Sequence, residues 1–147
     1  MPLVTGYELA ESFRDSNPDA VTYSDEYQVW VEPTDLVSLL QQVKGAKGYG
    51  FDYLSAITAV DYIEYFEVVY HLRNMARNQT GIVKTRLYDR ENPALESVTT
   101  LWRGADLQER EIWDLMGIRF DGHPNLKRIM LWEGFPGHPH RKDHMGG

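Results

Sequence analysis

The charged side chains of the segment EREIWD, residues 109–114, are the first candidates for chemistry in this sequence. Carboxylates spaced closely along one segment can donate and accept protons, provided that a second positioned group and a pocket accompany them. The four charged residues are Glu109, Arg110, Glu111 and Asp114. The sequence shows neither a second positioned group nor a pocket beside them, so we favour a structural role over acid–base catalysis.

The same segment is predicted to be a helix from about Leu107 to Met116. Asp106 is a good N-cap residue, and the glycine after Met116 is typical of a residue that ends a helix. Glu109 stands three residues after Asp106, so we interpret its carboxylate as a cap that returns to the backbone N–H of Asp106. Arg110 and Asp114 lie four residues apart and are expected to form an ordinary helical ion pair.

Histidines gather near the end of the chain, where they could bind zinc, copper or nickel. They are His123, His138, His140 and His144. Prolines, glycines and exposed-looking polar residues surround them, which weakens the idea, and HPH at 138–140 is the best bidentate candidate. This pattern keeps one alternative function open, a free-standing metal-dependent enzyme that uses these histidines with Glu109, Glu111 or Asp114.

The composition excludes several classes of protein. The chain has 147 residues, 42% of them hydrophobic and 25% charged, which is typical of one ordinary globular domain. No apolar run approaches the roughly 18 residues of a membrane span. The chain contains no cysteine, which excludes disulfides and cysteine-held iron–sulfur clusters. A net charge of −7 argues against nucleic-acid binding. The N-terminus has no secretory signal pattern, so we expect an unexported chain.

Hydrophobic periodicity predicts the elements that must position these residues. Thr5 can cap a first helix that stops near Asn17, and Thr34 can cap a second one with an apolar stripe that ends near Gly45. Alternating residues predict a β-hairpin over 20–33 and three further strands, over 51–62, 65–75 and 81–91. Ser97 can cap a short helix over 97–104.

These elements predict the fold class α+β, with helices packed on a mixed, largely antiparallel sheet. Residues 1–117 are expected to form this domain, and residues 118–147 an extended C-terminal arm. The arm differs electrically from the body, because residues 1–118 carry 10 basic and 19 acidic side chains whereas residues 119–147 carry 5 and 3. Its large apolar residues are too many for a solvated tail.

We therefore predict that the arm docks on another protein and that the body folds without residues 119–147. Trp132 and Phe135 are the expected apolar anchors, because aromatic residues dominate protein interfaces. Basic residues of the arm are expected to pair with carboxylates of the partner; they are Lys127, Arg128, Arg141 and Lys142.

The segment EREIWDLMGIRFDGHPNLKRIM resembles the signature of the 30-kDa subunit family of respiratory complex I. The signature residues are Glu109, Arg110, Glu111, Asp114, His123, Lys127, Arg128, Ile129 and Met130. The following EGFPGHPHRKD is similar to a second family motif, which ends on Arg141, Lys142 and Asp143. Asp143 is expected to belong to the partner interface with the basic residues before it. The sequence departs from the family after Asp143, where it continues with His144 and three more residues instead of an aromatic residue and proline.

The resemblance implies a cofactor-free peripheral-arm subunit of a membrane-associated, proton-translocating NAD(P)H:quinone oxidoreductase. Its implied partners are the large quinone-chamber subunit of the 49-kDa type and the iron–sulfur subunit that carries the terminal cluster. FMN, the iron–sulfur clusters and quinone are then expected elsewhere in the complex, and no catalytic residue in this chain. The implied location is the cytoplasmic face of the cell membrane, reached only through the complex. Equivalent subunits of membrane-bound hydrogenases and of F420H2- or ferredoxin-linked relatives remain alternatives.

Overall fold

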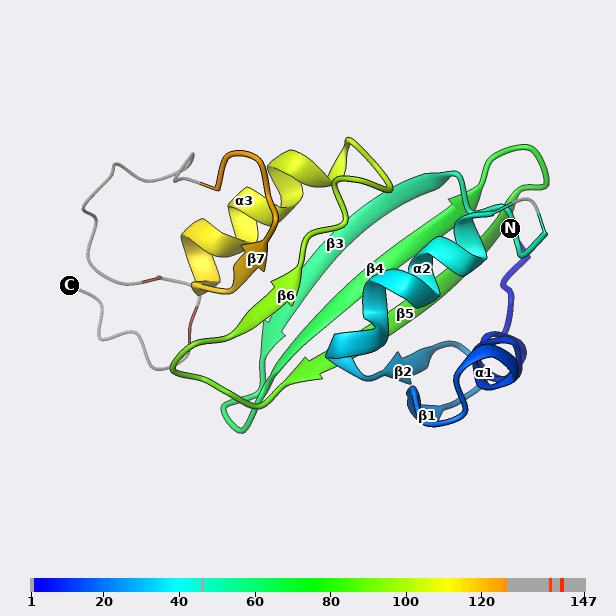
Figure 1. The fold of residues 1–147 in the computed structure, drawn as a ribbon, viewed down its shortest axis with the longest axis horizontal. Helices are drawn as coiled ribbons and strands as arrows, with labels where there is room; N and C mark the ends of the chain where they lie inside the picture. The colour runs from blue at the N-terminus through cyan, green and yellow to red at the C-terminus, as the bar shows by residue number, and fades with distance from the viewer. Residues whose placement is uncertain (1, 46, 127–137, 139–140, 142–147) are drawn as a thin grey trace.

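A computed structural model of the chain describes residues 2–45, 47–126, 138 and 141. Three α-helices pack on a five-stranded sheet of order β1-β2-β5-β4-β3, and a separate two-stranded sheet pairs β6 with β7, within these residues (Figure 1). The sheet is mixed, because β2 and β5 run parallel while the other pairs of the larger sheet are antiparallel. The predicted α+β class with a largely antiparallel sheet is confirmed.

The first helix, α1 (Gly6–Ser16), begins where the sequence predicts it, because Thr5 Oγ1 accepts a hydrogen bond of 3.1 Å from the backbone N–H of Glu8. It lies against the hairpin of β1 (Val21–Ser24) and β2 (Val29–Val31). The hairpin itself is as predicted.

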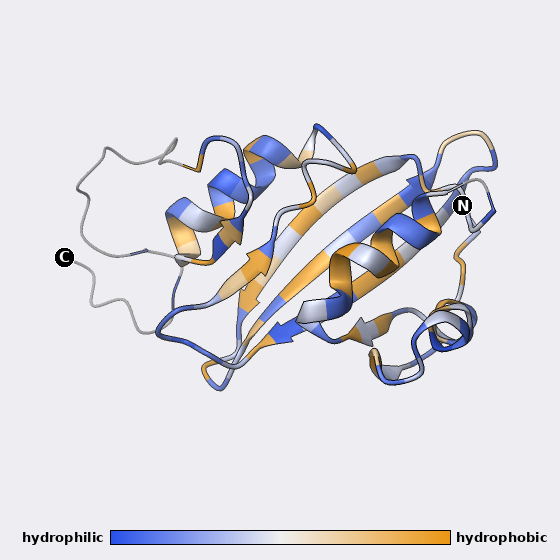
Figure 2. Cartoon of the chain, in the orientation of Figure 1, coloured by the Kyte–Doolittle hydropathy of each residue, from blue (hydrophilic) through white to orange (hydrophobic). Residues whose placement is uncertain are grey.

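The strands β3 (Tyr53–Asp61), β4 (Phe66–Asn74) and β5 (Gln79–Leu87) form an antiparallel meander, as their alternating residues predict. One face of β4 lies in the core, with Phe66, Val68, Tyr70 and Leu72 all buried. Figure 2 shows hydrophobic residues along these strands beneath the helix α2.

The second helix begins one residue later than the sequence suggests. Pro33–Asp35 form a turn of 3-10 helix, η1, and α2 then runs over Leu36–Lys44, with Asp35 in place of Thr34 at its N-terminal boundary. Proline fixes the backbone for the first turn of a helix, so the chain turns before the regular hydrogen bonds begin. The predicted apolar stripe is confirmed, since Leu36, Leu39, Leu40 and Val43 are buried against the sheet.

The region from 94 to 121 differs most from prediction. Residues 97–104 form turns instead of the predicted short helix. They connect β6 (Ala94–Glu96) to α3 (Ala105–Met116), after which β7 (Arg119–Asp121) pairs parallel with β6. Ile118 and Phe120 are almost fully buried in the core. Residues 118–121, which the sequence assigns to the arm, are therefore part of the body.

None of the helices in the described part of the chain is both long enough and apolar enough to cross a membrane.

Candidate docking site around helix α3

Glu109 occupies the inner face of α3, where its side chain is fully buried. Its Oε1 accepts a hydrogen bond of 2.6 Å from Ser97 Oγ, and its Oε2 accepts one of 2.8 Å from the backbone N–H of Val98. The predicted cap to Asp106 is wrong, because the helix already begins at Ala105 and both carboxylate oxygens of Glu109 bond elsewhere. The carboxylate instead ties α3 to the turn that follows β6.

Burial sets the protonation behaviour of this carboxyl group. Removal from water raises the pKa of Glu109, although the bonds from Ser97 and Val98 and the nearby His123 act in the opposite direction. The hydroxyl of Tyr70 is also fully buried; burial, with the neighbouring Glu109, raises its pKa well above 10. A carboxylate enclosed in this way has no exposed surface on which to meet a substrate, which favours a structural role.

The other charged residues of the EREIWD segment point in different directions. Arg110 lies 4.0 Å from the carboxylate of Asp106, one turn before it, so its ion pair is not the predicted one with Asp114. Glu111 is exposed to solvent, and Asp114 is fully buried. The structure does not bring these side chains together with Glu109 into one catalytic group.

The side chain of His123 connects the segment after β7 to the start of α3 through its contacts with Asp106. Its Nε2 lies 3.1 Å from the backbone oxygen of Asp106 and 3.0 Å from the Asp106 carboxylate, and its side chain is fully buried. Its Nδ1 accepts a hydrogen bond of 2.9 Å from the backbone N–H of Asn125. Because Nδ1 accepts, Nε2 is the ring nitrogen that can donate to Asp106. His123 therefore serves as a structural link in this structure.

A second link lies at the C-terminal end of α3. His138 Nδ1 is 2.9 Å from the backbone oxygen of Asp114, and Arg141 Nε donates to the backbone oxygen of Met116 at 2.5 Å. A cation is favourable there because the last carbonyl groups of a helix have no partner within it and carry partial negative charge. The guanidinium of Arg141 also lies 5.0 Å from the centre of the Phe66 ring, in cation–π geometry.

Gly117 makes room for this second link. Its φ of 76° lies in the left-handed region, and a Cβ atom at this position would be 2.6 Å from the His138 ring and 2.9 Å from the Arg141 guanidinium. Glycine is thus required for two reasons, the turn that ends α3 and the close approach of the returning chain. The sequence suggests the first reason only.

The predicted partner-interface residues fall in two groups. Arg141 contacts the chain's own helix end, as described above, where the sequence suggests a carboxylate of another protein. The remaining ones lie outside the described residues, so their roles stay predictions: Lys127, Arg128, Trp132, Phe135, Lys142 and Asp143. His140 and His144 lie outside them too.

The described part of the chain shows no metal-binding cluster of side chains. No group of three or more histidine, cysteine, aspartate or glutamate side chains there is arranged to hold an ion. Two of the four candidate histidines are described, and both contact backbone oxygens of α3.

Sequence reasoning missed Ser97 and Val98 as the partners of Glu109. The signal that could have pointed to a buried partner was the position of Glu109 on the apolar stripe of the helix, which directs its side chain inward. The identity of that partner depends on how the turn after β6 is placed, and no local pattern reveals it.

Residues 29–147 match the family model described as "Respiratory-chain NADH dehydrogenase, 30 Kd subunit". The chain belongs to this family. It is 43% identical over 120 residues to a C-type subunit of NADH-quinone oxidoreductase from Rhizobium meliloti (strain 1021), in a match that covers 80% of this chain and 65% of that protein. The resemblance found from the signature residues is confirmed.

Two further matches bear on the setting of the family. A C/D-type NADH-quinone oxidoreductase protein of Phocaeicola vulgatus is 40% identical over 105 residues, which cover 71% of this chain and 20% of that protein. A chain of the solved membrane-bound sulfane sulfur reductase, an archaeal respiratory membrane complex, is 29% identical with a TM-score of 0.71. That match covers 94% of this chain and 84% of the archaeal one. Chains similar to this one thus occur in enzyme complexes with different names.

Proposed function

We propose that the chain is a peripheral subunit of a membrane-associated, proton-translocating NAD(P)H:quinone oxidoreductase and that it supports the neighbouring subunits without catalysing a step itself. The family match over residues 29–147 carries the proposal. The enclosed position of Glu109 agrees with it, since the signature carboxylate is used to hold α3 in place. In this proposal the complex acts at the cytoplasmic face of the cell membrane.

The chain is further proposed to hold no redox cofactor. Iron–sulfur clusters are held mainly by cysteine thiolates, and the sequence has no cysteine. FMN, the clusters and quinone would then be bound by other subunits, and electrons would pass without entering this one.

The proposed partners are the large quinone-chamber subunit of the 49-kDa type and the iron–sulfur subunit that carries the terminal cluster. The Phocaeicola vulgatus relative supports a close neighbour, because its name joins a C-type and a D-type subunit in one protein. We take the D-type subunit to be the large one. The archaeal complex, a sulfane sulfur reductase, contains a chain of the same fold. No residue of this chain identifies the electron donor, and NAD(P)H is proposed from the names of the family relatives alone.

Affinity purification from native membranes tests the proposal. A tagged chain, extracted in mild detergent, is expected to bring down the large subunit and the iron–sulfur subunit in equal amounts, together with NADH:quinone reductase activity. Recovery of the chain without these subunits would contradict the proposal. Metal analysis of the purified chain separates the metal-enzyme alternative, because stoichiometric zinc, nickel or iron bound to it would favour that alternative.

A further inference from the structure

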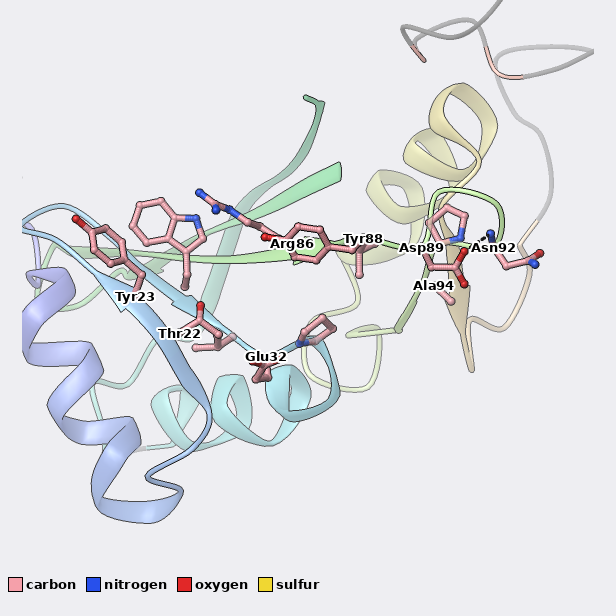
Figure 3. Close-up of a pocket in the computed structure, with 13 residues that line it drawn as sticks. Thr22, Tyr23, Glu32, Arg86, Tyr88, Asp89, Asn92 and Ala94 are labelled. Atoms are coloured by element: carbon pink, nitrogen blue, oxygen red, sulfur yellow. Dashed lines mark hydrogen bonds between the residues drawn. The ribbon is translucent and has the colours of Figure 1, made fainter. Parts of the chain in front are cut away.

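A groove of about 710 Å³ opens at the junction of the hairpin with the meander, where β2 ends but β5 continues (Figure 3). Its walls come from both strands of the hairpin, from Glu32 and Pro33, from the end of β5 and from the loop 88–94. In Figure 3 the side chains of Tyr23, Arg86, Tyr88, Asp89 and Asn92 follow one another along the lining, so the groove is elongated. Neither the family signature nor the proposed arm includes any of them.

The groove exists because β2 and β5 have different lengths. β2 pairs with β5 at only two positions, Val29 with Val83 and Trp30 with Lys84, whereas β5 runs on to Leu87. After β2 the chain turns away at Pro33, which has no backbone N–H to continue a ladder. Thr85 still donates to the backbone oxygen of Val31 through its hydroxyl, so β5 borders the groove instead of another strand only at Arg86 and Leu87. Open strand edges of this kind accept extended segments of other proteins.

Aromatic side chains and one cation form the first end of the groove. The Trp30 ring lies 5.2 Å from that of Tyr23, and the Arg86 guanidinium lies 5.7 Å from the Trp30 ring. Trp30 is only 8% exposed but lies outside the main core, and its Nε1 donates to the buried carboxylate of Glu67 at 3.0 Å. The Trp30 ring is thus held in place before any partner arrives.

The two ends of the groove carry opposite charges. Arg86 donates to Glu67 through Nε at 3.1 Å. Its own side chain remains 38% exposed, so the guanidinium can still meet an added carboxylate. Asp89, exposed at the other end, uses one oxygen to accept from the backbone N–H of Asn92 and has no ionic partner in the described part of the chain. Glu32, also exposed, adds a second negative charge to the lining.

We propose that this groove binds an extended segment of a neighbouring subunit, with an acidic side chain at Arg86, apolar or proline residues along Trp30 and Tyr88, and a basic side chain at Asp89. The inference rests on the proposed function, which supplies the neighbouring subunit. The open strand edge and the elongated shape fit a polypeptide, and the order of charges fixes its direction. Aromatic and arginine side chains are the usual anchors of such contacts.

Photocrosslinking in the native complex tests this inference. The photoreactive amino acid p-benzoylphenylalanine is placed at Tyr88, a groove residue that is 65% exposed, and the irradiated complex is digested and analysed by mass spectrometry. We expect an adduct to one segment of another subunit, in which an acidic and a basic residue flank an apolar stretch. An adduct within this chain, an adduct to lipid or quinone, or no adduct would overturn the inference.

Charge variants in the same experiment test how the segment is held. Arg86→Gln is expected to lower the adduct yield about tenfold, the effect of one lost charge-assisted contact. Arg73→Gln is the matched control, because Arg73 lies on β4 outside the groove and bonds Asn78 at 3.0 Å; its yield should not change. An unchanged yield with Arg86→Gln would overturn the proposal.

A second variant keeps the test decisive if Arg86→Gln does not assemble. Asp89→Asn retains an oxygen for the Asn92 N–H and removes only the charge, so it should lower the yield while leaving the fold intact.

The inference about the groove and the proposed function fail in different ways. A chain that recovers its partner subunits but gives no adduct from Tyr88 refutes the groove alone, whereas a chain without partner subunits refutes the proposed function.

Discussion

Glu109 holds two hydrogen bonds inside the core, and the two replacements below separate the bonds from the charge. Glu109→Ala should lower the free energy of unfolding by about 2–4 kcal/mol, because it leaves a cavity and removes the acceptor of the Val98 N–H. Glu109→Gln should cost less, since its amide can accept from Val98 and donate to the Ser97 oxygen. Urea unfolding of the isolated chain measures both changes, and equal losses would contradict the proposed role of the bonds.

The raised pKa of Glu109 also gives the stability of the chain a pH dependence. The folded chain keeps this proton at pH values above 4.5 at which the unfolded chain has released it. The unfolded state then binds fewer protons, so the free energy of unfolding from this group falls as the pH rises from 4.5 through the raised pKa. Glu109→Gln cannot titrate. As the pH rises over that range, the free energy of unfolding of wild type should therefore fall relative to that of the variant. A difference in unfolding free energy that stays constant with pH would contradict the expectation.

Gly117 offers a second test at the residue scale. Gly117→Ala should destabilise the chain by about 1–2 kcal/mol through its positive φ, and by more through overlap with the His138 ring. Gly122→Ala is the matched control, because Gly122 has a φ of 84° but nothing within 4 Å of the added methyl group. Thermal unfolding of the two variants isolates the overlap. Equal losses would show that His138 does not lie against Gly117 in solution.

Among the elements, those with a clear period could be predicted from the sequence. The strands β3, β4 and β5 and the buried stripe of α2 follow directly from alternating or helical spacing of apolar residues. The parallel pairs β2–β5 and β6–β7 could not be predicted. The strands β6 and β7 are three residues long and carry too little pattern, and the alternation that predicts β2 does not reveal its second neighbour. The turns over 97–104 look like a helix in the sequence because Ser97 is a typical cap residue, yet its hydroxyl bonds Glu109 instead.

The strand β7 changes what a truncation should do. A chain of residues 1–118 loses β7 and Phe120, which is 1% exposed, so it should unfold at least about 3 kcal/mol more easily than a chain of residues 1–125. The longer chain keeps β7 and the His123 link to α3. Urea unfolding followed by circular dichroism compares them. Equal stability would restore the domain boundary that the sequence suggests at residue 117.

For the whole molecule, the family could be predicted from the sequence because its signature is long and has fixed gaps. The contacts that its residues make within the chain could not be predicted. The sequence suggests a partner protein for Arg141, yet this side chain contacts Met116 within the chain, since no sequence pattern reveals which helix end a distant cation will meet. The groove at Trp30 and Arg86 could not be foreseen for a similar reason, because it arises from unequal strand lengths.

Docking through the arm is tested on assembled complexes. A chain of residues 1–125 should remain folded but should no longer co-purify with the large subunit, because it lacks the predicted anchors Trp132 and Phe135. Full-length chain carrying Trp132→Ala should show a partial loss, while His144→Ala should assemble normally. Wild-type recovery of the large subunit with the shortened chain would place the main contact on the body.

The parallel pair of β2 with β5 has a consequence for the order in which the chain folds. The meander β3–β4–β5 is joined by short connections, so its strands can meet early at small cost in loop-closure entropy. Val31 and Thr85, which bond at this junction, are 54 positions apart. Contacts of such separation form late in folding. The hairpin of β1 and β2 is therefore expected to join a preformed meander, and until it does, the edge of β5 at Val83 and Lys84 is a site for incorrect strand pairing.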